Sequence, residues 1–208
     1  MKLISGNTKS TNRDIPYKHY KHEEISNSLT IILPGAGYTT QAPLLHYTTG
    51  IMLEKGSDIL LVNYNYSQEE VSSLSADEHT SDVQAVIETI LKANDYTDFT
   101  IVAKSLGTIA LTHLLNYPKY HAAKAIWLTP LLQRNDVYNA LLNNKNQALC
   151  IIGDKDPCYI YEKFEEIKNN NILKTSLIEG ANHSLEIEGD IFKSIEVLKD
   201  VMVKIDEF

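Results

Sequence analysis

Strands that alternate with helices along the chain predict an α/β fold, with a mostly parallel sheet covered by helices on both faces. Three observations support this prediction. Short apolar runs rich in isoleucine, leucine and valine recur along the chain, as expected of strands buried on both faces. Stretches of helical composition separate these runs. Glycines and polar residues follow several strands directly, at the edge where sheets of this kind bind their ligands.

Length and composition limit the class of protein. The chain has 208 residues, of which 43% are hydrophobic, so a single domain over residues 1–208 with a sizeable core is expected. A formal net charge of -8 argues against nonspecific binding to nucleic acid or to an anionic membrane. Two cysteines, Cys150 and Cys158, are too few for a disulfide framework, and no signal peptide or membrane-spanning run is present. We therefore predict a cytoplasmic protein without nucleic-acid or membrane partners.

The expected elements follow one another in a regular order. Ser75 and Glu78 form a capping box that predicts the start of a helix, and Gly56 predicts the end of an earlier one. Residues 1–27 are polar and are expected to supply one or two edge strands, whereas residues 64–74 are expected to form a polar loop. The remaining strands are expected at 28–33, 58–63, 99–103, 123–129, 148–153 and 173–178. The helices are expected at 41–55, 75–93, 108–115, 136–143, 159–168 and 191–205.

The segment Phe99–Thr108 carries the clearest functional signal. A buried strand runs into a helical stretch within a few residues, with Ser105 at the turn between them. This arrangement is typical of a nucleophile elbow, in which strand and helix pass so closely that the positions two before and two after the serine must be small. Ala103 and Gly107 meet that requirement. The N–H of Leu106 then lies at the first turn of the helix, where it favours a developing oxyanion.

Three further loops follow strands and are expected at the same edge of the sheet. Pro34–Gly37 is a glycine-rich loop that can turn backbone N–H groups outward, Asp154–Pro157 supplies an acid, and Gly180–Ser184 supplies His183. A serine hydroxyl is a weak nucleophile that needs a neighbouring base, and the base needs an acid to hold its tautomer. All three groups occur in the chain order serine, acid, histidine.

On these four loops the chain resembles the α/β-hydrolase superfamily, from about Ser28 to its end, and is most similar to small lidless members such as dienelactone hydrolases and small carboxylesterases. The resemblance implies the α/β-hydrolase fold without a sizeable cap domain, and neither a cofactor nor a metal. It also implies individual roles. They are Ser105 as nucleophile, Asp156 as acid, His183 as base, and the N–H groups of Leu106 and Ala36 as oxyanion hole, with Gly37 as the alternative to Ala36.

Two positions leave alternatives open. Asp154 competes with Asp156 for the role of acid. The resemblance favours Asp156, which directly precedes a proline, and Asp154 is then expected to accept hydrogen bonds from backbone amides of the turn. Lys104, directly before the serine, either binds an anionic group of the substrate or pairs with a carboxylate such as Glu179, because a buried lysine needs a partner.

These features predict a serine hydrolase that cleaves a small ester or thioester through an acyl-enzyme. Gly37, Tyr38 and Lys104 are candidates for the substrate pocket. Residues 130–147 leave room for one helix and not for a cap domain, so an open site suited to small acyl substrates is expected. The alternatives are a peptidase or dienelactone-type hydrolase with the same triad, and a noncatalytic protein of the same fold that binds a ligand.

Overall fold

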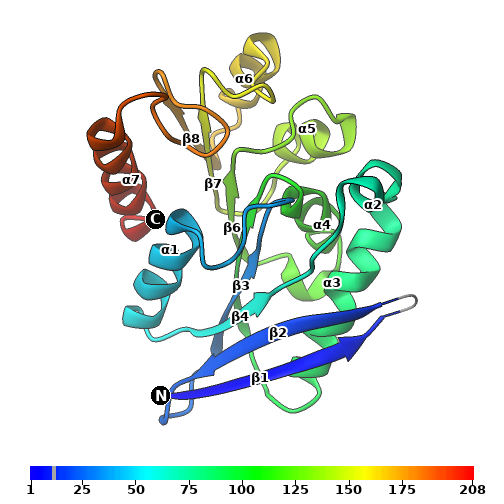
Figure 1. Ribbon diagram of the computed structural model, residues 1–208. Coiled ribbons are helices and arrows are strands. Elements are labelled where there is room, and N and C mark those ends of the chain that lie inside the picture. The colour runs from blue at the N-terminus through cyan, green and yellow to red at the C-terminus, as the bar shows by residue number, and fades with distance from the viewer. Residues whose placement is uncertain (11–12) are drawn as a thin grey trace.

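One eight-stranded sheet forms the centre of the computed structural model, which describes residues 1–10 and 13–208 (Figure 1). The strand order is β1-β2-β4-β3-β5-β6-β7-β8. The strands are β1 (Lys2–Lys9), β2 (Asp14–Lys21), β3 (Ser28–Leu33), β4 (Asp58–Val62), β5 (Asp98–Lys104), β6 (Lys124–Leu128), β7 (Ala148–Gly153) and β8 (Leu173–Ile178). β1 and β2 form an antiparallel hairpin, β2 is also antiparallel to β4, and all other pairs are parallel. The edge strands expected within residues 1–27 are therefore confirmed.

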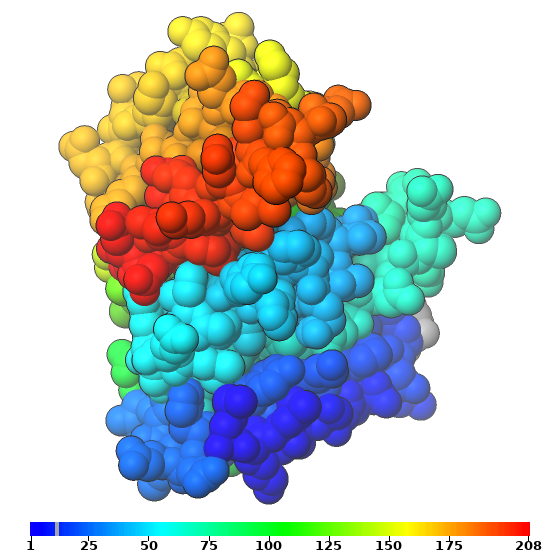
Figure 2. Space-filling model, turned by 60° about the vertical axis from the view of Figure 1, so that its left-hand side comes forward, coloured from blue at the N-terminus to red at the C-terminus, as the bar shows by residue number. Residues whose placement is uncertain are grey.

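Helices cover both faces of this sheet. Those of the described residues are α1 (Pro43–Glu54), α2 (Gln68–Ser73), α3 (Ala76–Leu91), α4 (Gly107–Leu114), α5 (Asn135–Leu142), α6 (Tyr161–Ile167) and α7 (Ile191–Asp206), with a short 3₁₀ turn η1 at Pro118–Tyr120. α1 and α7 pack side by side on one face (Figure 2), whereas α3, α4, α5 and α6 contribute to the core on the other (Figure 1). In the described part of the chain, no helix combines the length and apolar character that crossing a membrane requires.

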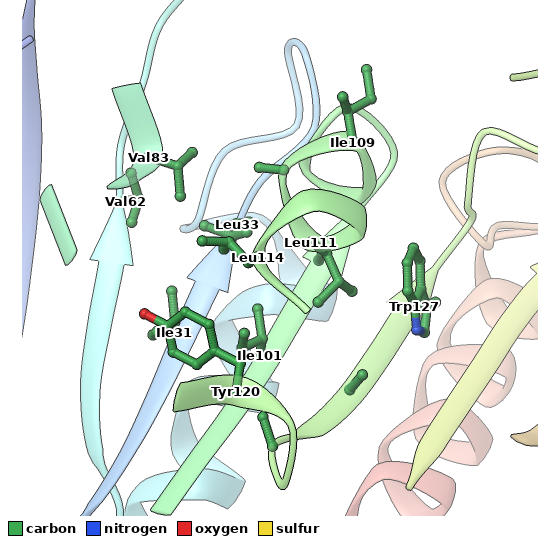
Figure 3. Packing of buried hydrophobic residues seen from close by; sticks show 14 of the residues in the cluster. Ile31, Leu33, Val62, Val83, Ile101, Ile109, Leu111, Leu114, Tyr120 and Trp127 are labelled. Atoms are coloured by element: carbon green, nitrogen blue, oxygen red, sulfur yellow. The ribbon is translucent and has the colours of Figure 1, made fainter. Parts of the chain in front are cut away.

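Residues of the central strands alternate between the two cores. Ile31 and Leu33 of β3 pack toward α3 and α4, whereas Ile32 between them packs toward α1 and α7. Figure 3 shows the first of these cores, in which Leu111 and Leu114 of α4 lie against the strands. Because both faces of each strand are buried, the strands have the nearly continuous apolar sequences from which they were predicted. Each such side chain stabilises the fold by roughly 1.5–3 kcal/mol.

The parallel strands bring the four polar loops to one edge. β3, β5, β7 and β8 run in the same direction, so the loops that follow them emerge together at the carboxyl edge of the sheet. Between β6 and β7 the chain forms only α5 and its connections. The carboxyl edge therefore has no cap domain, as the sequence predicts.

The helix α2 differs from the prediction, because it lies in the segment expected to be a polar loop. It begins with a capping box in which Ser67 and Glu70 bind each other's backbone N–H groups. None of its residues is buried, so it lacks the apolar stripe on which a helix prediction depends. The spacing of Ser67 and Glu70 was the available signal.

Candidate active site

Ser105 occupies a strained turn between β5 and α4. Its φ of 50° lies in the left-handed region that residues with a side chain rarely adopt. The N–H of Ser105 donates to the carbonyl of Leu128 on β6 over 3.0 Å, and the N–H of Gly107 donates to the carbonyl of Pro34 over 3.1 Å. A Cβ on Gly107 would lie 2.6 Å from the carbonyl oxygen of Leu33, so only glycine fits there. The close passage predicted for the elbow is therefore present.

His183 joins this serine to a buried carboxylate. Its Nε2 lies 2.8 Å from Ser105 Oγ, and its Nδ1 lies 2.8 and 2.9 Å from the two carboxylate oxygens of Asp156. The side chain of Asp156 is fully buried, and its Oδ1 also accepts a hydrogen bond from the N–H of Cys158 over 2.7 Å. A carboxylate beside Nδ1 keeps the proton on that nitrogen and leaves Nε2 free to accept one. The arrangement can therefore take a proton from the serine hydroxyl.

Asp154, the competing acid, is occupied elsewhere. Its Oδ1 accepts a hydrogen bond of 2.7 Å from the N–H of Gly180, which ties the β7 loop to the loop that carries His183. The two loops pass very closely, since a Cβ on Gly153 would lie 1.9 Å from the carbonyl oxygen of Ala181. Asp154 thus binds a backbone amide of the neighbouring loop and not, as the sequence predicts, one of its own turn, while Asp156 faces the imidazole.

Backbone donors lie beside the serine. Within the described residues, no group accepts a hydrogen bond from the N–H of Leu106, Ala36 or Gly37. Leu106 is the N-cap of α4, so the positive end of the helix dipole adds to its N–H. The Pro34–Gly37 loop is held from behind by Tyr64, whose hydroxyl donates to the carbonyl of Pro34. No internal hydrogen bond of the described residues therefore competes for these three N–H groups.

Lys104 is placed differently from both sequence expectations. Its exposed fraction is 1%, so its ammonium does not face a substrate pocket. No carboxylate of the described residues forms an ion pair with it, and Glu179, the expected partner, is exposed at the surface. Its Nζ instead donates to Thr129 Oγ1 over 3.0 Å and to the carbonyl of His183 over 2.8 Å, and lies 4.4 Å from the centre of the Tyr38 ring. Burial lowers the pKa of Lys104 to about 8.

A small cavity of about 290 Å³ adjoins the glycine-rich loop. Gly37 lines it, whereas Tyr38 covers Lys104. All of the residues that line the cavity are uncharged. They are Pro34, Gly35, Ala36, Gly37, Thr39, Thr40, Asn63, Tyr64, Asn65 and Tyr66.

The side chains of Asp156, Cys158 and His183 are close enough to be considered as metal ligands, since their ligand atoms lie within 4.8 Å of one another. Two properties argue against that use. Both carboxylate oxygens of Asp156 already contact His183. Burial raises the pKa of the Cys158 thiol to about 11, and a protonated thiol is a poor ligand. We therefore assign no metal to these residues.

Thr129 is a site neighbour that sequence reasoning missed. It is fully buried at the end of β6, and its φ of 46° is unusual for a β-branched residue. Its N–H donates to the carbonyl of Ile151 over 2.7 Å, and its hydroxyl accepts the bond from Lys104. Its position directly before Pro130 at a strand end was the only available signal, and that signal does not indicate a positive φ.

Comparison with known proteins places this geometry in a known fold. The sequence matches no protein-family model and no curated protein. Est1E from Butyrivibrio proteoclasticus, solved with ferulic acid, has a TM-score of 0.76 at 14% sequence identity, over 98% of this chain and 97% of that one. A serine hydrolase without a lid from Xanthomonas campestris has a TM-score of 0.73 at 12% sequence identity, over 100% of this chain and 93% of that one. Dienelactone hydrolase from Anabaena variabilis has a TM-score of 0.70 at 15% sequence identity, over 99% of this chain and 95% of that one.

The chain has the α/β-hydrolase fold. The fold predicted from the sequence, without a cap domain, is thus confirmed. In this α/β-hydrolase fold, Ser105 lies after β5, Asp156 after β7 and His183 after β8. Sequence identities this low show the fold alone, and a shared fold does not determine the activity.

Proposed function

We propose that the protein is a serine hydrolase that cleaves a small ester or thioester. The observation that carries this proposal is the hydrogen-bonded chain from Ser105 through His183 to Asp156, with the serine in a strained elbow. An ordinary turn serine has no reason to adopt a positive φ beside a histidine whose other nitrogen faces a buried carboxylate. The similarity in fold to a serine hydrolase without a lid and to a dienelactone hydrolase supports the same function.

In the first half of the proposed reaction, Ser105 Oγ attacks the carbonyl carbon of the substrate while its proton passes to His183 Nε2. The carbonyl oxygen becomes an oxyanion, which the N–H groups of Leu106 and Ala36 bind. Asp156 stabilises the imidazolium that results. The tetrahedral intermediate then collapses as His183 returns the proton to the departing alcohol or thiol, which leaves an acyl group on the serine.

In the second half, a water molecule attacks the acyl-enzyme. His183 takes a proton from the water, and the same N–H groups bind the second oxyanion. Collapse of this intermediate releases the carboxylic acid and returns the proton to Ser105. Each loss of one oxyanion donor is expected to lower kcat by about 10²-fold or more.

The substrate is proposed to be small and uncharged near the reacting carbonyl. The cavity beside the glycine-rich loop is lined by the proposed donor Ala36 but not by Ser105 or His183, and it has a volume of about 290 Å³ with only uncharged lining residues. A volume of roughly 300 Å³ is at the lower end for ligand sites. The connection between β6 and β7 holds only α5, so no cap encloses a long acyl chain. The names of two proteins of similar fold, a dienelactone hydrolase from Anabaena variabilis and an esterase from Pyrococcus furiosus, agree with this substrate class.

The test is hydrolysis of p-nitrophenyl acetate and butyrate by the wild type and by Ser105→Ala, together with labelling by a fluorophosphonate probe. Turnover and labelling are expected in the wild type, and both should be lost in Ser105→Ala. Ser81→Ala, which changes an exposed serine of α3, is the matched control and should behave as the wild type. Folded wild-type protein that shows neither turnover nor labelling would contradict the proposal and favour a noncatalytic ligand-binding protein.

A further inference from the structure

The ammonium of Lys104 is the point at which four parts of the site meet. Lys104 itself directly precedes the proposed nucleophile at the end of β5. Its Nζ donates to the carbonyl of His183, in the loop after β8, and to the hydroxyl of Thr129, after β6. The ring of Tyr38, in the loop after β3, covers it at 4.4 Å. A single charged group therefore contacts the loops that follow β3, β6 and β8.

These partners are unusual for a buried lysine. A buried ammonium usually pairs with a carboxylate, because the loss of hydration is otherwise expensive. Here two uncharged oxygens and an aromatic face replace the carboxylate. These contacts give the ammonium two hydrogen-bond acceptors and the face of an aromatic ring, from three different loops. The arrangement favours a geometric role over simple charge neutralisation.

The contacts of Lys104 bear on the groups that the reaction needs. Its bond to the carbonyl of His183 fixes the backbone that carries the imidazole. Tyr38 accepts hydrogen bonds through both its backbone carbonyl and its side-chain hydroxyl. Its carbonyl accepts from the N–H of Gly35 over 3.2 Å, and its hydroxyl accepts from the N–H of Leu44, at the start of α1, over 3.1 Å. The ammonium thus links the histidine loop to the loop that carries the proposed oxyanion donors.

We propose that Lys104 is a positioning residue, whose ammonium holds the His183 loop and the Pro34–Tyr38 loop in register with Ser105. This inference rests on the proposed hydrolase function and adds a requirement to it. A small displacement of the imidazole from the serine lowers the rate strongly, because about 1 Å of misplacement can cost roughly 10²-fold. Removing the ammonium should therefore lower kcat more than it changes KM.

The charge of Lys104 gives the inference a second readout. Burial lowers its pKa to about 8, while Asp156, Cys158 and Glu186 favour the charged form. Two neighbours of Lys104 have pKa values above that of its ammonium, because burial raises the pKa of the Tyr38 hydroxyl and raises that of the Cys158 thiol to about 11. Above pH 8 the amine loses one N–H and its attraction to the ring. The wild-type kcat should therefore fall between pH 8 and 9.5.

The experiment compares Lys104→Met and Lys104→Gln with a matched control, Lys163→Met. Lys163 also donates to a backbone carbonyl, that of Leu132, and lies over a tyrosine ring, that of Tyr138, but it lies on α6 outside the site. We expect kcat for p-nitrophenyl acetate to fall by about tenfold or more in Lys104→Met, with KM within about twofold, and to fall less in Lys104→Gln, which keeps an N–H donor. Lys163→Met should keep the wild-type kcat. The fall of kcat above pH 8 should disappear in Lys104→Met.

The outcomes separate this inference from the function on which it rests. If the wild type shows no labelling by fluorophosphonate, the hydrolase proposal fails and the inference falls with it. If the wild type is labelled and Lys104→Met keeps the wild-type kcat and pH profile, only the inference is overturned. If Lys104→Met does not fold, as judged by circular dichroism, Lys104→Gln and the wild-type pH profile decide. A wild-type kcat that stays level up to pH 9.5, together with an unchanged kcat in Lys104→Gln, then overturns it.

Discussion

Two clusters of aspartate, histidine and hydroxyl groups lie at opposite edges of the sheet. The carboxyl-edge cluster is the proposed active site, with the chain of hydrogen bonds from Ser105 through His183 to Asp156. The amino-edge cluster lies where β4 begins. It consists of Asp58, Tyr96, His19 and His22. The same types of side chain therefore occur twice in one fold.

The side chains of the amino-edge cluster are hydrogen-bonded to one another. The hydroxyl of Tyr96 donates to Asp58 over 2.6 Å, so it accepts from the Nε2 of His19 at 2.9 Å. The backbone N–H and the Nδ1 of His22 also lie within hydrogen-bond distance of Asp58, at 2.8 and 3.1 Å. Burial opposes ionisation of Asp58, but the bonds from Tyr96 and His22 outweigh it and lower its pKa. This cluster stabilises the pairing of β2, from the β1–β2 hairpin, with β4.

The two clusters differ in their order of groups and in their backbone. At the carboxyl edge the histidine lies between acid and hydroxyl, so it can accept the proton of the hydroxyl while the carboxylate stabilises the imidazolium. At the amino edge the hydroxyl lies between acid and histidine, where it already donates its proton. The three non-glycine residues with positive φ in the described chain are Ser105, Thr129 and Leu185, all in loops at the carboxyl edge. Backbone strain and order of contact, rather than residue type, distinguish the candidate site.

The largest expected effect is on the acid of the carboxyl-edge cluster. Asp156→Asn should lower kcat by about 10⁴-fold, because the amide no longer holds the required imidazole tautomer. Asp154→Asn is the control and should keep kcat within a few-fold of the wild type, since Asp154 binds only the backbone of Gly180. Hydrolysis of p-nitrophenyl acetate measures both. A larger loss in Asp154→Asn than in Asp156→Asn would reverse the assignment.

The next effect concerns the acid of the amino-edge cluster. Asp58→Ala leaves the buried hydroxyl of Tyr96 and the half-buried donors of His22 without their acceptor, so the free energy of unfolding should fall by about 3 kcal/mol. Urea denaturation measures this loss. At 25 °C kcat should equal that of the wild type in folded protein. A kcat lowered tenfold with unchanged stability would show that the two edges are coupled.

Acid pH should destabilise the fold through the amino-edge histidine. Burial lowers the pKa of His19 to about 4 from 6.5, so the unfolded chain binds its proton first as the pH falls. The stabilising contribution is fully present above pH 6.5 and is lost progressively toward pH 4. Melting temperatures at pH 7.0, 5.5 and 4.5 should therefore decrease, and less so in His19→Leu. Equal decreases in both proteins would contradict this assignment.

The smallest expected effect is that of removing the hydrogen bond from Tyr64 to the glycine-rich loop. Tyr64→Phe removes the hydroxyl that donates to the carbonyl of Pro34 and should cost about 1 kcal/mol of stability. Because the ring remains in place, kcat should fall by less than about tenfold. Steady-state kinetics and thermal unfolding of the same preparation separate the two effects. Tyr17→Phe, in the hairpin, is a control that should leave kcat unchanged.

Most of the fold could be predicted from the sequence, because burial on both faces marks each central strand. The amphipathic pattern of residues 191–205, for example, predicts helix α7 within one residue of its end at Asp206. Helix α2 was missed because none of its side chains is buried. The positions of Ser105, Asp156 and His183 at strand ends could be predicted, since parallel strands bring their carboxyl ends to one edge.

The sequence by itself determined the α/β layout and which side chains could meet at the carboxyl edge, because periodicity and strand direction are local properties. The tertiary structure alone decided how those side chains pair. It directs Lys104 to Thr129 and His183 instead of a carboxylate, and it directs Asp154 to an amide of the loop after β8 instead of one in its own turn. These choices depend on distances between loops far apart in the chain, and no local pattern encodes such distances.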